Sequence, residues 1–331
     1  MAYFRQLDEQ VQQMLALLHK EERWLIVINA DHDALGAALA LKRILSRRVA
    51  EVAISQVNEI KRPDNLAMIR YLRIKTRRLI PNLAAQYDRF ALLDSQPHHH
   101  PAFQEIPFAI VIDHHPLVED KPVNAAFVDV RPKYGATCTM LTEYLYNLGI
   151  KPARLLATAL LYGIKCDTQD YERGFIDADV SAFKYLAKTA DRQLLTRITK
   201  SEFHLEWIRY FSRAFYNLQR VGQGLYAHMG KVENSDILVI VADFFTRVHG
   251  IAWNVISGEC DGKLVIVFRG DGLRKDMGQF AKDLFGDAGS AGGHRRAARA
   301  EIEIKNVDAL DAEAFVLNRL CKGKCALNKK T

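Results

Sequence analysis

The chain has 331 residues, of which 49% are hydrophobic and 26% are charged, and its formal net charge at pH 7 is +7. This balance is typical of a globular protein, and the length predicts two domains rather than one. Every apolar run falls well short of the ~20 residues that a membrane span needs, which argues against an integral membrane protein. The positive charge favours an anionic partner, such as a nucleotide or nucleic acid.

The first residues and the cysteines bear on the cellular compartment. Residues 1–20 mix leucines at helical spacing with Gln, Asp and Glu, which is not the pattern of a signal peptide. The five cysteines are scattered and odd in number, as is typical of reduced thiols. We therefore expect a cytoplasmic protein.

Strand and helix patterns alternate through the N-terminal part of the chain. The expected strands cover residues 24–29, 49–57, 89–93 and 108–112. The expected helices cover residues 7–22, 34–47, 63–72, 135–148, 153–164 and 177–188. Because strands and helices alternate, the sequence predicts a parallel sheet flanked by helices.

The pattern changes in the C-terminal part. Residues 190–220 are polar with apolar positions at helical spacing, and we interpret them as helices that link two domains. Beyond them, strands are expected over 225–229, 237–242 and 264–268, and helices over 246–257, 276–285 and 308–320. The predicted fold class is therefore α/β, with a parallel-sheet domain over 1–188, a helical linker over 189–224 and a smaller α/β domain over 225–331.

Acidic residues and histidines follow three of the expected strands. Asp31 and Asp33 follow the first strand, Asp94 ends the third, and Asp113-His114-His115 follow the fourth. Ligands of open α/β sheets gather at the carboxyl ends of strands, and carboxylates with imidazole suit a divalent cation such as Mn²⁺. Asp31 or Asp33 could instead only cap the next helix, because Asp is a preferred N-cap residue. Capping does not explain why three strands end in this way.

A glycine-rich stretch over 286–296 ends in Gly292-Gly293-His294-Arg295-Arg296. Small residues let backbone amides approach an anion closely. The histidine and the two arginines favour a phosphate-binding loop over a flexible surface loop.

Asp31-x-Asp33, Asp94, Asp113-His114-His115, Asp167 and Gly292-Gly293-His294 occur in the order of the motifs of the DHH phosphoesterase superfamily. The chain resembles, over nearly its whole length, the two-domain branch in which a DHH domain precedes a DHH-associated C-terminal domain. That branch includes nanoRNase/pAp phosphatases and relatives of the exonuclease RecJ. The resemblance implies a metal-dependent phosphoesterase for short oligonucleotides or nucleoside bisphosphates, with its active site in the cleft between the domains.

The resemblance also implies the metal ligands. Asp33, Asp94, His114 and Asp167 match the ligands of one metal, usually manganese, with magnesium as an alternative. Asp94 is expected to bridge to a second metal, which Asp31 also binds.

Further roles follow for the residues around the metals. Asp113 is expected to orient the ligand geometry, and His115 is expected to face the substrate phosphate. In the C-terminal domain, Arg269 and His294 match residues that hold phosphate, and Gly292 and Gly293 belong to the same loop.

The chain departs from the family pattern at the second metal. Family members usually carry a histidine four residues before the first aspartate, where this chain has Val27. We therefore expect one tightly bound metal and a weakened second site. His32 could replace the missing ligand, although adjacent side chains on an extended segment point apart. Ala37 stands where serine is usual, and a glycine expected after His294 is replaced near Arg299.

Two alternatives to the enzyme follow from these patterns. Val27 favours a catalytically impaired protein that binds nucleotides or regulates. A processive exonuclease is disfavoured, because no further domain with aromatic stacking platforms is evident. We expect a short single-stranded nucleic acid or nucleotide as the substrate and no membrane partner, and a homodimer is left open. We interpret His98-His99-His100 as a solvent-exposed loop.

Overall fold

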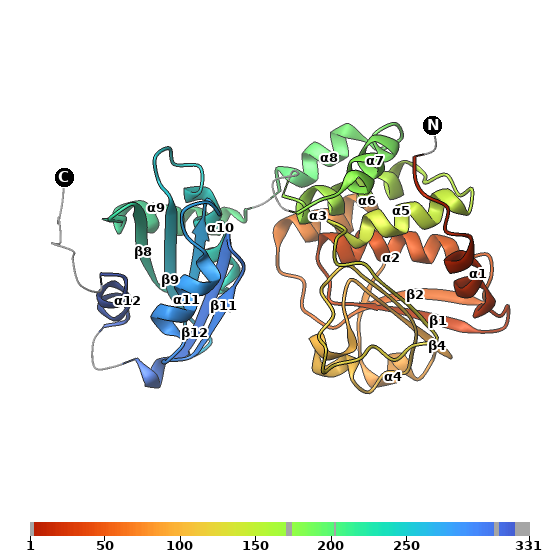
Figure 1. Ribbon diagram of the computed structural model, residues 1–331, viewed down its shortest axis with the longest axis horizontal. Helices are drawn as coiled ribbons and strands as arrows, with labels where there is room; N and C mark the ends of the chain where they lie inside the picture. Colours follow the sequence, from red (N-terminus) through yellow and green to blue (C-terminus); the bar gives the residue numbers. More distant parts are fainter. Residues whose placement is uncertain (1–2, 170–173, 202, 308–310, 322–331) are drawn as a thin grey trace. The chain divides into compact units, whose positions relative to one another are not determined.

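The computed structural model describes residues 3–169, 174–201, 203–307 and 311–321. The chain divides into two compact units, Met1–Glu202 and Phe203–Thr331. The division falls inside the expected linker, since α8 (Arg192–Thr199) belongs to the first unit and α9 (Ile208–Tyr216) to the second. Each unit has its own six-stranded sheet with helices (Figure 1), which confirms the predicted α/β fold class. Among the described residues, no helix is long and apolar enough to cross a bilayer.

The first unit contains a parallel sheet with the strand order β3-β2-β1-β4-β5-β6. Its strands are β1 (Arg23–Ile28), β2 (Glu51–Gln56), β3 (Arg77–Arg78), β4 (Arg89–Leu93), β5 (Phe108–Asp113) and β6 (Phe127–Val130). The direction of winding reverses between β1 and β4. At such a switch point the loops after the two strands diverge and leave room for a ligand. The loops after β1 and β4 are the ones that carry Asp31, Asp33 and Asp94.

Side chains of β1 alternate between the two faces of this sheet. Ile26 and Ile28 pack into the main core with the helices, and Leu25 and Val27 pack into a smaller apolar cluster on the other face. Figure 1 shows α2, α5 and α6 on one side of the strands and α4 on the other. The helices of this unit are α1 (Asp8–Ala16), α2 (His32–Leu45), α3 (Pro63–Leu72), α4 (Pro81–Ala84), α5 (Thr137–Asn147), α6 (Arg154–Asp167), α7 (Asp177–Leu186) and α8.

The four strands and the helices that the sequence predicts for this unit are confirmed, with shifted ends. The first helix stops at Ala16 rather than at residue 22. Strands β3 and β6 were not expected, because two and four residues are too short for an alternating pattern to stand out. Two short 3₁₀ helices, η1 (Pro97–His99) and η2 (Pro101–Phe103), follow β4.

The second unit contains a mixed sheet with the order β11-β12-β10-β9-β8-β7, in which β8 and β9 run parallel and the other neighbours antiparallel. Its strands are β7 (Gln219–Val221), β8 (Gly224–Lys231), β9 (Trp253–Cys260), β10 (Lys263–Gly270), β11 (Ser290–Gly293) and β12 (Ala297–Glu303). Its helices are η3 (Leu205–Trp207), α9, α10 (Asp236–Phe245), α11 (Met277–Phe285), η4 (Ile304–Asn306) and α12 (Ala312–Leu320).

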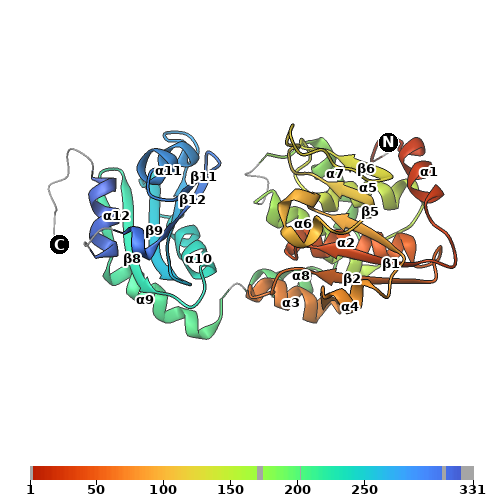
Figure 2. The same ribbon diagram turned by 90° about the horizontal axis from the view of Figure 1, so that it is seen from below.

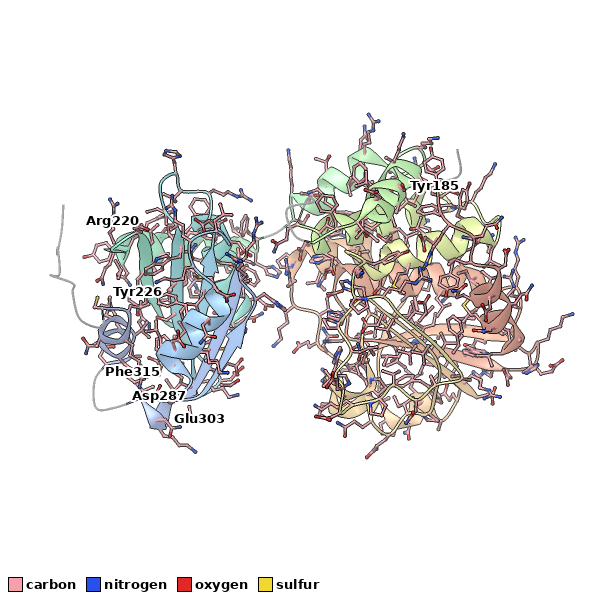
Figure 3. All side chains as sticks on the ribbon, viewed as in Figure 1. Tyr185, Arg220, Tyr226, Asp287, Glu303 and Phe315 are labelled. Atoms are coloured by element: carbon pink, nitrogen blue, oxygen red, sulfur yellow. The ribbon has the colours of Figure 1, made fainter. Side chains whose placement is uncertain are left out.

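Helices cover both faces of the second sheet. Tyr226 of β8 and Phe315 of α12 (Figure 3) belong to one apolar cluster, and α9 and α10 contribute to another. Figure 2 shows α10 and α12 on opposite sides of β9. The sheet is therefore the middle layer of this unit.

Two predictions for the second unit are wrong. Residues 237–242, expected as a strand, lie in α10, and residues 246–257, expected as a helix, contain the start of β9. A short, continuous apolar run does not distinguish a buried strand from a buried helix. In α10 the buried positions follow helical spacing, at Ile237, Leu238, Val241, Ala242 and Phe245. The helix predicted over 308–320 is confirmed from residue 312; residues 308–310 lie outside the described part of the chain.

Candidate active site

The loop after β1 places two carboxylates at the start of α2. Asp31 is the N-cap residue, and its side chain accepts a hydrogen bond from the Ala34 amide at 2.9 Å. Asp33 lies in the first turn and is fully buried. Its carboxylate accepts hydrogen bonds from the backbone amides of Thr137 and Cys138, at the start of α5. The two aspartates thus have different roles. Asp31 caps α2, whereas Asp33 accepts hydrogen bonds from the N-terminus of α5.

Asp94 follows β4 directly and has a left-handed backbone, with φ of 55°. Non-glycine residues seldom adopt this conformation, and such strain is found where a side chain must be aimed. The Asp94 side chain is buried, and its Oδ1 accepts a hydrogen bond from Thr137 Oγ1 at 2.9 Å. The start of α5 therefore contacts both Asp33 and Asp94.

His114 follows β5, and its two ring nitrogens have different surroundings. Nδ1 lies 3.1 Å from the backbone oxygen of Tyr134, which can only accept, so Nδ1 carries a proton. Nε2 lies 3.0 Å from Asp167 Oδ2 and 3.5 Å from Asp94 Oδ1. It is buried and has no well-aligned hydrogen bond to any described residue. In the neutral ring, its lone pair therefore points among carboxylates.

Close packing of helices brings Asp167 to this position. Asp167 is the last residue of α6, and α6 lies against α2. Gly163 has no room for a side chain, because a Cβ there would lie 2.6 Å from Cys138 Sγ and 3.2 Å from the Cα of Asp33. As a result, ligand atoms of Asp33, His114 and Asp167 lie within 4.8 Å of one another.

Ligand atoms of Asp94, His114 and His115 form a second group, and they also lie within 4.8 Å of one another. The structure therefore brings together around His114 the four residues expected to hold the first metal. Asp31 belongs to neither group among the described residues, although its charge raises the pKa of Asp94.

Burial and mutual repulsion dominate the electrostatics of this cluster. Burial and the neighbouring Asp167 raise the pKa of Asp33 to about 6. Burial and the charges of Asp33 and Asp31 raise the pKa of Asp94 well above its usual value. Burial opposes the charge of His114, but contacts with Asp167 and Asp33 raise its pKa to about 9. Carboxylates held this close favour a cation in their midst.

Asp113 supports His115 rather than joining the carboxylate cluster. Its Oδ1 lies 2.8 Å from His115 Nδ1, and its Oδ2 accepts a hydrogen bond from Gln96 Nε2 at 2.8 Å. Burial opposes the charge of Asp113, but these hydrogen bonds lower its pKa. The His115 side chain is 46% exposed. The arrangement fixes the ring while leaving it accessible to a ligand.

Val27 and His32 lie where the chain departs from the family pattern. The Val27 side chain is fully buried in the apolar cluster with Leu92 and Phe103. His32 Nε2 lies 2.7 Å from Asp64 Oδ2 in α3, and both side chains are almost completely buried. That nitrogen of His32 is therefore engaged by Asp64.

In the second unit, the glycine-rich stretch forms a β-hairpin rather than the expected loop. Gly292 and Gly293 lie in β11, which pairs with β12. Gly293 has φ of 148°, and a Cβ there would lie 2.5 Å from the Ala297 oxygen, so this position requires glycine. The His294 oxygen accepts a hydrogen bond from the amide of Gly278 in α11. The hairpin turn therefore covers the start of α11.

Arg269 lies next to the end of β10 and is paired with Ala297 of the same hairpin. Arg269 and His294 therefore lie at the same end of the second sheet. The Arg269 Nε is 2.5 Å from Asp243 Oδ1. Any anion bound by Arg269 must compete with this carboxylate.

The sequence does not single out four residues around the side chains of the candidate active site: Gln96, Tyr134, Thr137 and Arg131, whose guanidinium donates hydrogen bonds to Asp129 and Glu143. Thr137 could have been found, because the helix expected over 135–148 places a hydroxyl residue near its start. Gln96, Tyr134 and Arg131 act through contacts that the sequence does not show.

Comparisons with known proteins bear on this arrangement. Residues 23–164 match the protein family described as the DHH family, N-terminal domain. The match includes the strand ends that carry Asp31, Asp33, Asp94 and Asp113-His114-His115, and Asp167 lies three residues beyond it.

Similarity to other proteins extends beyond residues 23–164. The uncharacterized protein MJ1633 of Methanocaldococcus jannaschii is 33% identical over 290 residues, which is 87% of this chain. The chain spans 59% of the length of that relative. An exopolyphosphatase-related protein from Bacteroides fragilis has a similar fold, with a TM-score of 0.74 at 15% identity. That comparison covers 95% of this chain and 96% of the other.

Proposed function

We propose that the protein is a metal-dependent phosphoesterase that hydrolyses short oligonucleotides or nucleoside bisphosphates. The observation that carries the proposal is the environment of His114 Nε2. This buried atom has no well-aligned hydrogen bond to any described residue, and it lies 3.0 Å from the Asp167 carboxylate and 3.5 Å from that of Asp94. A histidine whose Nδ1 is fixed by a backbone carbonyl, with Nε2 facing carboxylates, is the usual arrangement of a metal ligand.

The donor set fits a hard or borderline divalent cation, with Mn²⁺ as the expected metal and Mg²⁺ as an alternative. Asp33, Asp94, His114 and Asp167 would hold it, and Asp31 would contribute to a weaker second site. When bound, the cation would supply positive charge for the phosphoryl oxygens and acidify a water molecule. Asp113 would keep His115 oriented toward the substrate phosphate, since it holds the ring through Nδ1.

We further propose that residues of the second unit bind the part of the substrate that is not hydrolysed. Arg269, Gly292, Gly293 and His294 are the candidates, on the basis of the family resemblance. Arg269→Ala should raise KM for a dinucleotide about tenfold or more while changing kcat little, because it removes a charge-assisted contact present in ground and transition states.

Arg299→Ala is the matched control, because Arg299 pairs with Glu301 on β12 and has no proposed substrate contact. Steady-state kinetics of both variants would check the role. An Arg269→Ala protein with the wild-type KM for every short nucleotide would contradict it.

A second candidate function, nucleotide binding without efficient catalysis, is favoured by Val27. A buried valine among apolar neighbours offers no ligand for a second metal. We expect Val27→His to destabilise the metal-free protein by about 1–3 kcal/mol, because it buries a polar ring. In Mn²⁺ the variant should bind a second ion and turn over faster.

Leu25→His is the control, since Leu25 lies on the same face of β1 as Val27 but two residues further from the carboxyl end of the strand. It should lose stability without gaining metal. A metal titration with unfolding curves would compare the three proteins. If Val27→His gained neither metal nor rate, position 27 would not face a metal.

The substrate class is tested with a panel of phosphate esters. Metal-stripped protein would be assayed with and without Mn²⁺ on pApA, on the nucleoside bisphosphate pAp and on a long single strand. We expect Mn²⁺-dependent hydrolysis of pApA or pAp and slow action on the long strand. Binding of AMP without turnover of any of these esters would instead support the second candidate function.

A further inference from the structure

The sequence carries three adjacent histidines after β4, and the structure distinguishes the middle one. The His99 ring lies 5.5 Å from the His115 ring, measured between centroids. Ligand atoms of His99, Asp113 and His115 lie within 4.8 Å of one another. His100 instead accepts a hydrogen bond from the Ala102 amide and caps η2. His99 therefore lies beside the proposed phosphate-binding histidine.

Local hydrogen bonds fix the His99 ring and its tautomer. The Gln96 amide donates to His99 Nδ1 at 3.1 Å, and Ser95 Oγ lies 3.3 Å from the same nitrogen. A backbone amide can only donate, so Nδ1 accepts and the proton of the neutral ring is on Nε2. Burial lowers the pKa of His99, which keeps the ring neutral. The residue is still exposed, so a ligand can approach the ring.

His115 has the opposite arrangement. Its Nδ1 faces the Asp113 carboxylate at 2.8 Å, which requires a proton on Nδ1. Two neighbouring imidazoles are thus held in different tautomers by different partners. His99 offers a hydrogen-bond donor without needing a positive charge.

We propose that His99 is a further substrate-binding residue, whose Nε2–H donates a hydrogen bond to a phosphate oxygen of the ester held beside His115. The proposal rests on the phosphoesterase function proposed above. The ligand class is a phosphate ester or its phosphate product. A metal at His99 and His115 is disfavoured, because both Asp113 oxygens already accept hydrogen bonds, from His115 and Gln96.

Two substitutions distinguish the two functions of the His99 ring, which are the Nε2–H donor and the Nδ1 acceptor of the Gln96 amide. In His99→Asn, the amide oxygen can still accept from the Gln96 amide, but the donor at the Nε2 position is lost. In His99→Gln, a longer amide can place a donor near that position. His100→Asn is the matched control, because His100 also accepts from a backbone amide at 3.1 Å but lies at η2.

In Mn²⁺, kcat/KM for pApA and the affinity for AMP, from calorimetry, would be measured for each protein. We expect His99→Asn to lower kcat/KM about 10- to 100-fold and AMP affinity by about tenfold, the effect of losing a hydrogen bond to a charged group. His99→Gln should recover part of both, and His100→Asn should match wild type. Bound Mn²⁺ and the unfolding temperature should not change.

Three results would overturn the proposal. One is a His99→Asn protein with wild-type turnover and AMP binding. Another is equal loss in the Asn and Gln variants with a lowered unfolding temperature, which indicates a structural cap. The third is loss of a bound Mn²⁺ ion in His99→Asn. If wild type itself hydrolysed no ester, the proposed function would fail, whereas weaker AMP binding by His99→Asn would still support the His99 contact.

Discussion

Replacing Asp94 by asparagine should abolish phosphate-ester hydrolysis and raise the stability of the metal-free protein. The substitution removes the carboxylate proposed to be shared between two metals. Bound metals stabilise the charge of the transition state by several kcal/mol, so turnover should fall about a thousandfold or more. It also removes one of the buried charges that repel each other, while Asn can still accept the hydrogen bond from Thr137. An unfolding temperature about 2–4 °C higher corresponds to about 1 kcal/mol in a domain of this size.

Asp179→Asn provides the contrast. Asp179 is also fully buried, but it accepts hydrogen bonds from the Gly135 and Ile176 amides and from Thr139. It should lose stability and keep Mn²⁺ binding. Thermal unfolding with and without Mn²⁺, together with turnover, would be measured for both variants to distinguish the roles of Asp94 and Asp179. Wild-type turnover in Asp94→Asn would mean that the chemistry lies elsewhere.

Arg131→Met should be the most destabilising change near the site. The Arg131 guanidinium makes hydrogen bonds to Asp129 and Glu143, and all three side chains are largely buried. Without Arg131, Asp129 keeps only the hydrogen bond from Tyr144 among the described residues, and Glu143 keeps those from Tyr134 and a longer ion pair with Arg5 at 3.7 Å. Removing one partner of a buried ion pair typically costs about 3–5 kcal/mol. Arg131 also lies where its backbone amide donates to the backbone oxygen of Asp113, and the following turn provides the Tyr134 oxygen that fixes His114. Loss of Mn²⁺ affinity should accompany the loss of stability.

Arg23→Met is the control for this loss. Arg23 pairs with Glu51 at 2.8 Å, but both side chains are more than 40% exposed. Exposed pairs contribute little to stability, because water screens the two charges. Denaturant unfolding of both variants gives the comparison, and equal losses would show that the buried pair is no more important than the exposed one.

The first unit was largely predictable from the sequence because its signals are local. Buried runs such as 89–93 and 108–112 end on Asp94 and Asp113, and the parallel sheet that they imply brings those ends together. In a parallel sheet, all strands run in the same direction, so their carboxyl ends lie at the same edge of the sheet. This explains why Asp33, Asp94 and His114 could be grouped from the sequence. Asp167 ends helix α6 rather than a strand, and only the family resemblance pointed to it.

The second unit was less predictable because its runs are ambiguous. Residues 236–245 are apolar throughout most of their length, and only their burial pattern reveals α10. The glycines of 289–293 signal flexibility in isolation, yet Gly293 is a hairpin position packed against Ala297. In such stretches tertiary packing decides the conformation, and propensity does not.

Contacts between distant residues were out of reach of the sequence. The three histidines after β4 have the same surroundings in the sequence, and only the fold places His99 beside His115. Arg131 also reads as one of many arginines until its two carboxylate partners are seen. A sequence pattern therefore indicates candidate metal ligands at strand ends more readily than it indicates the residues that support those ligands through long-range contacts.

Anomalous X-ray diffraction at the manganese edge, from a crystal soaked in Mn²⁺, would locate the metal that the carboxylates and His114 are proposed to bind. We expect one strong peak enclosed by Asp33, Asp94, His114 and Asp167, with any second peak weaker and beside Asp31. The peak should vanish in Asp94→Asn. Absence of a peak from this cluster in the wild-type crystal, or a strong peak elsewhere in the protein, would contradict the proposed metal site.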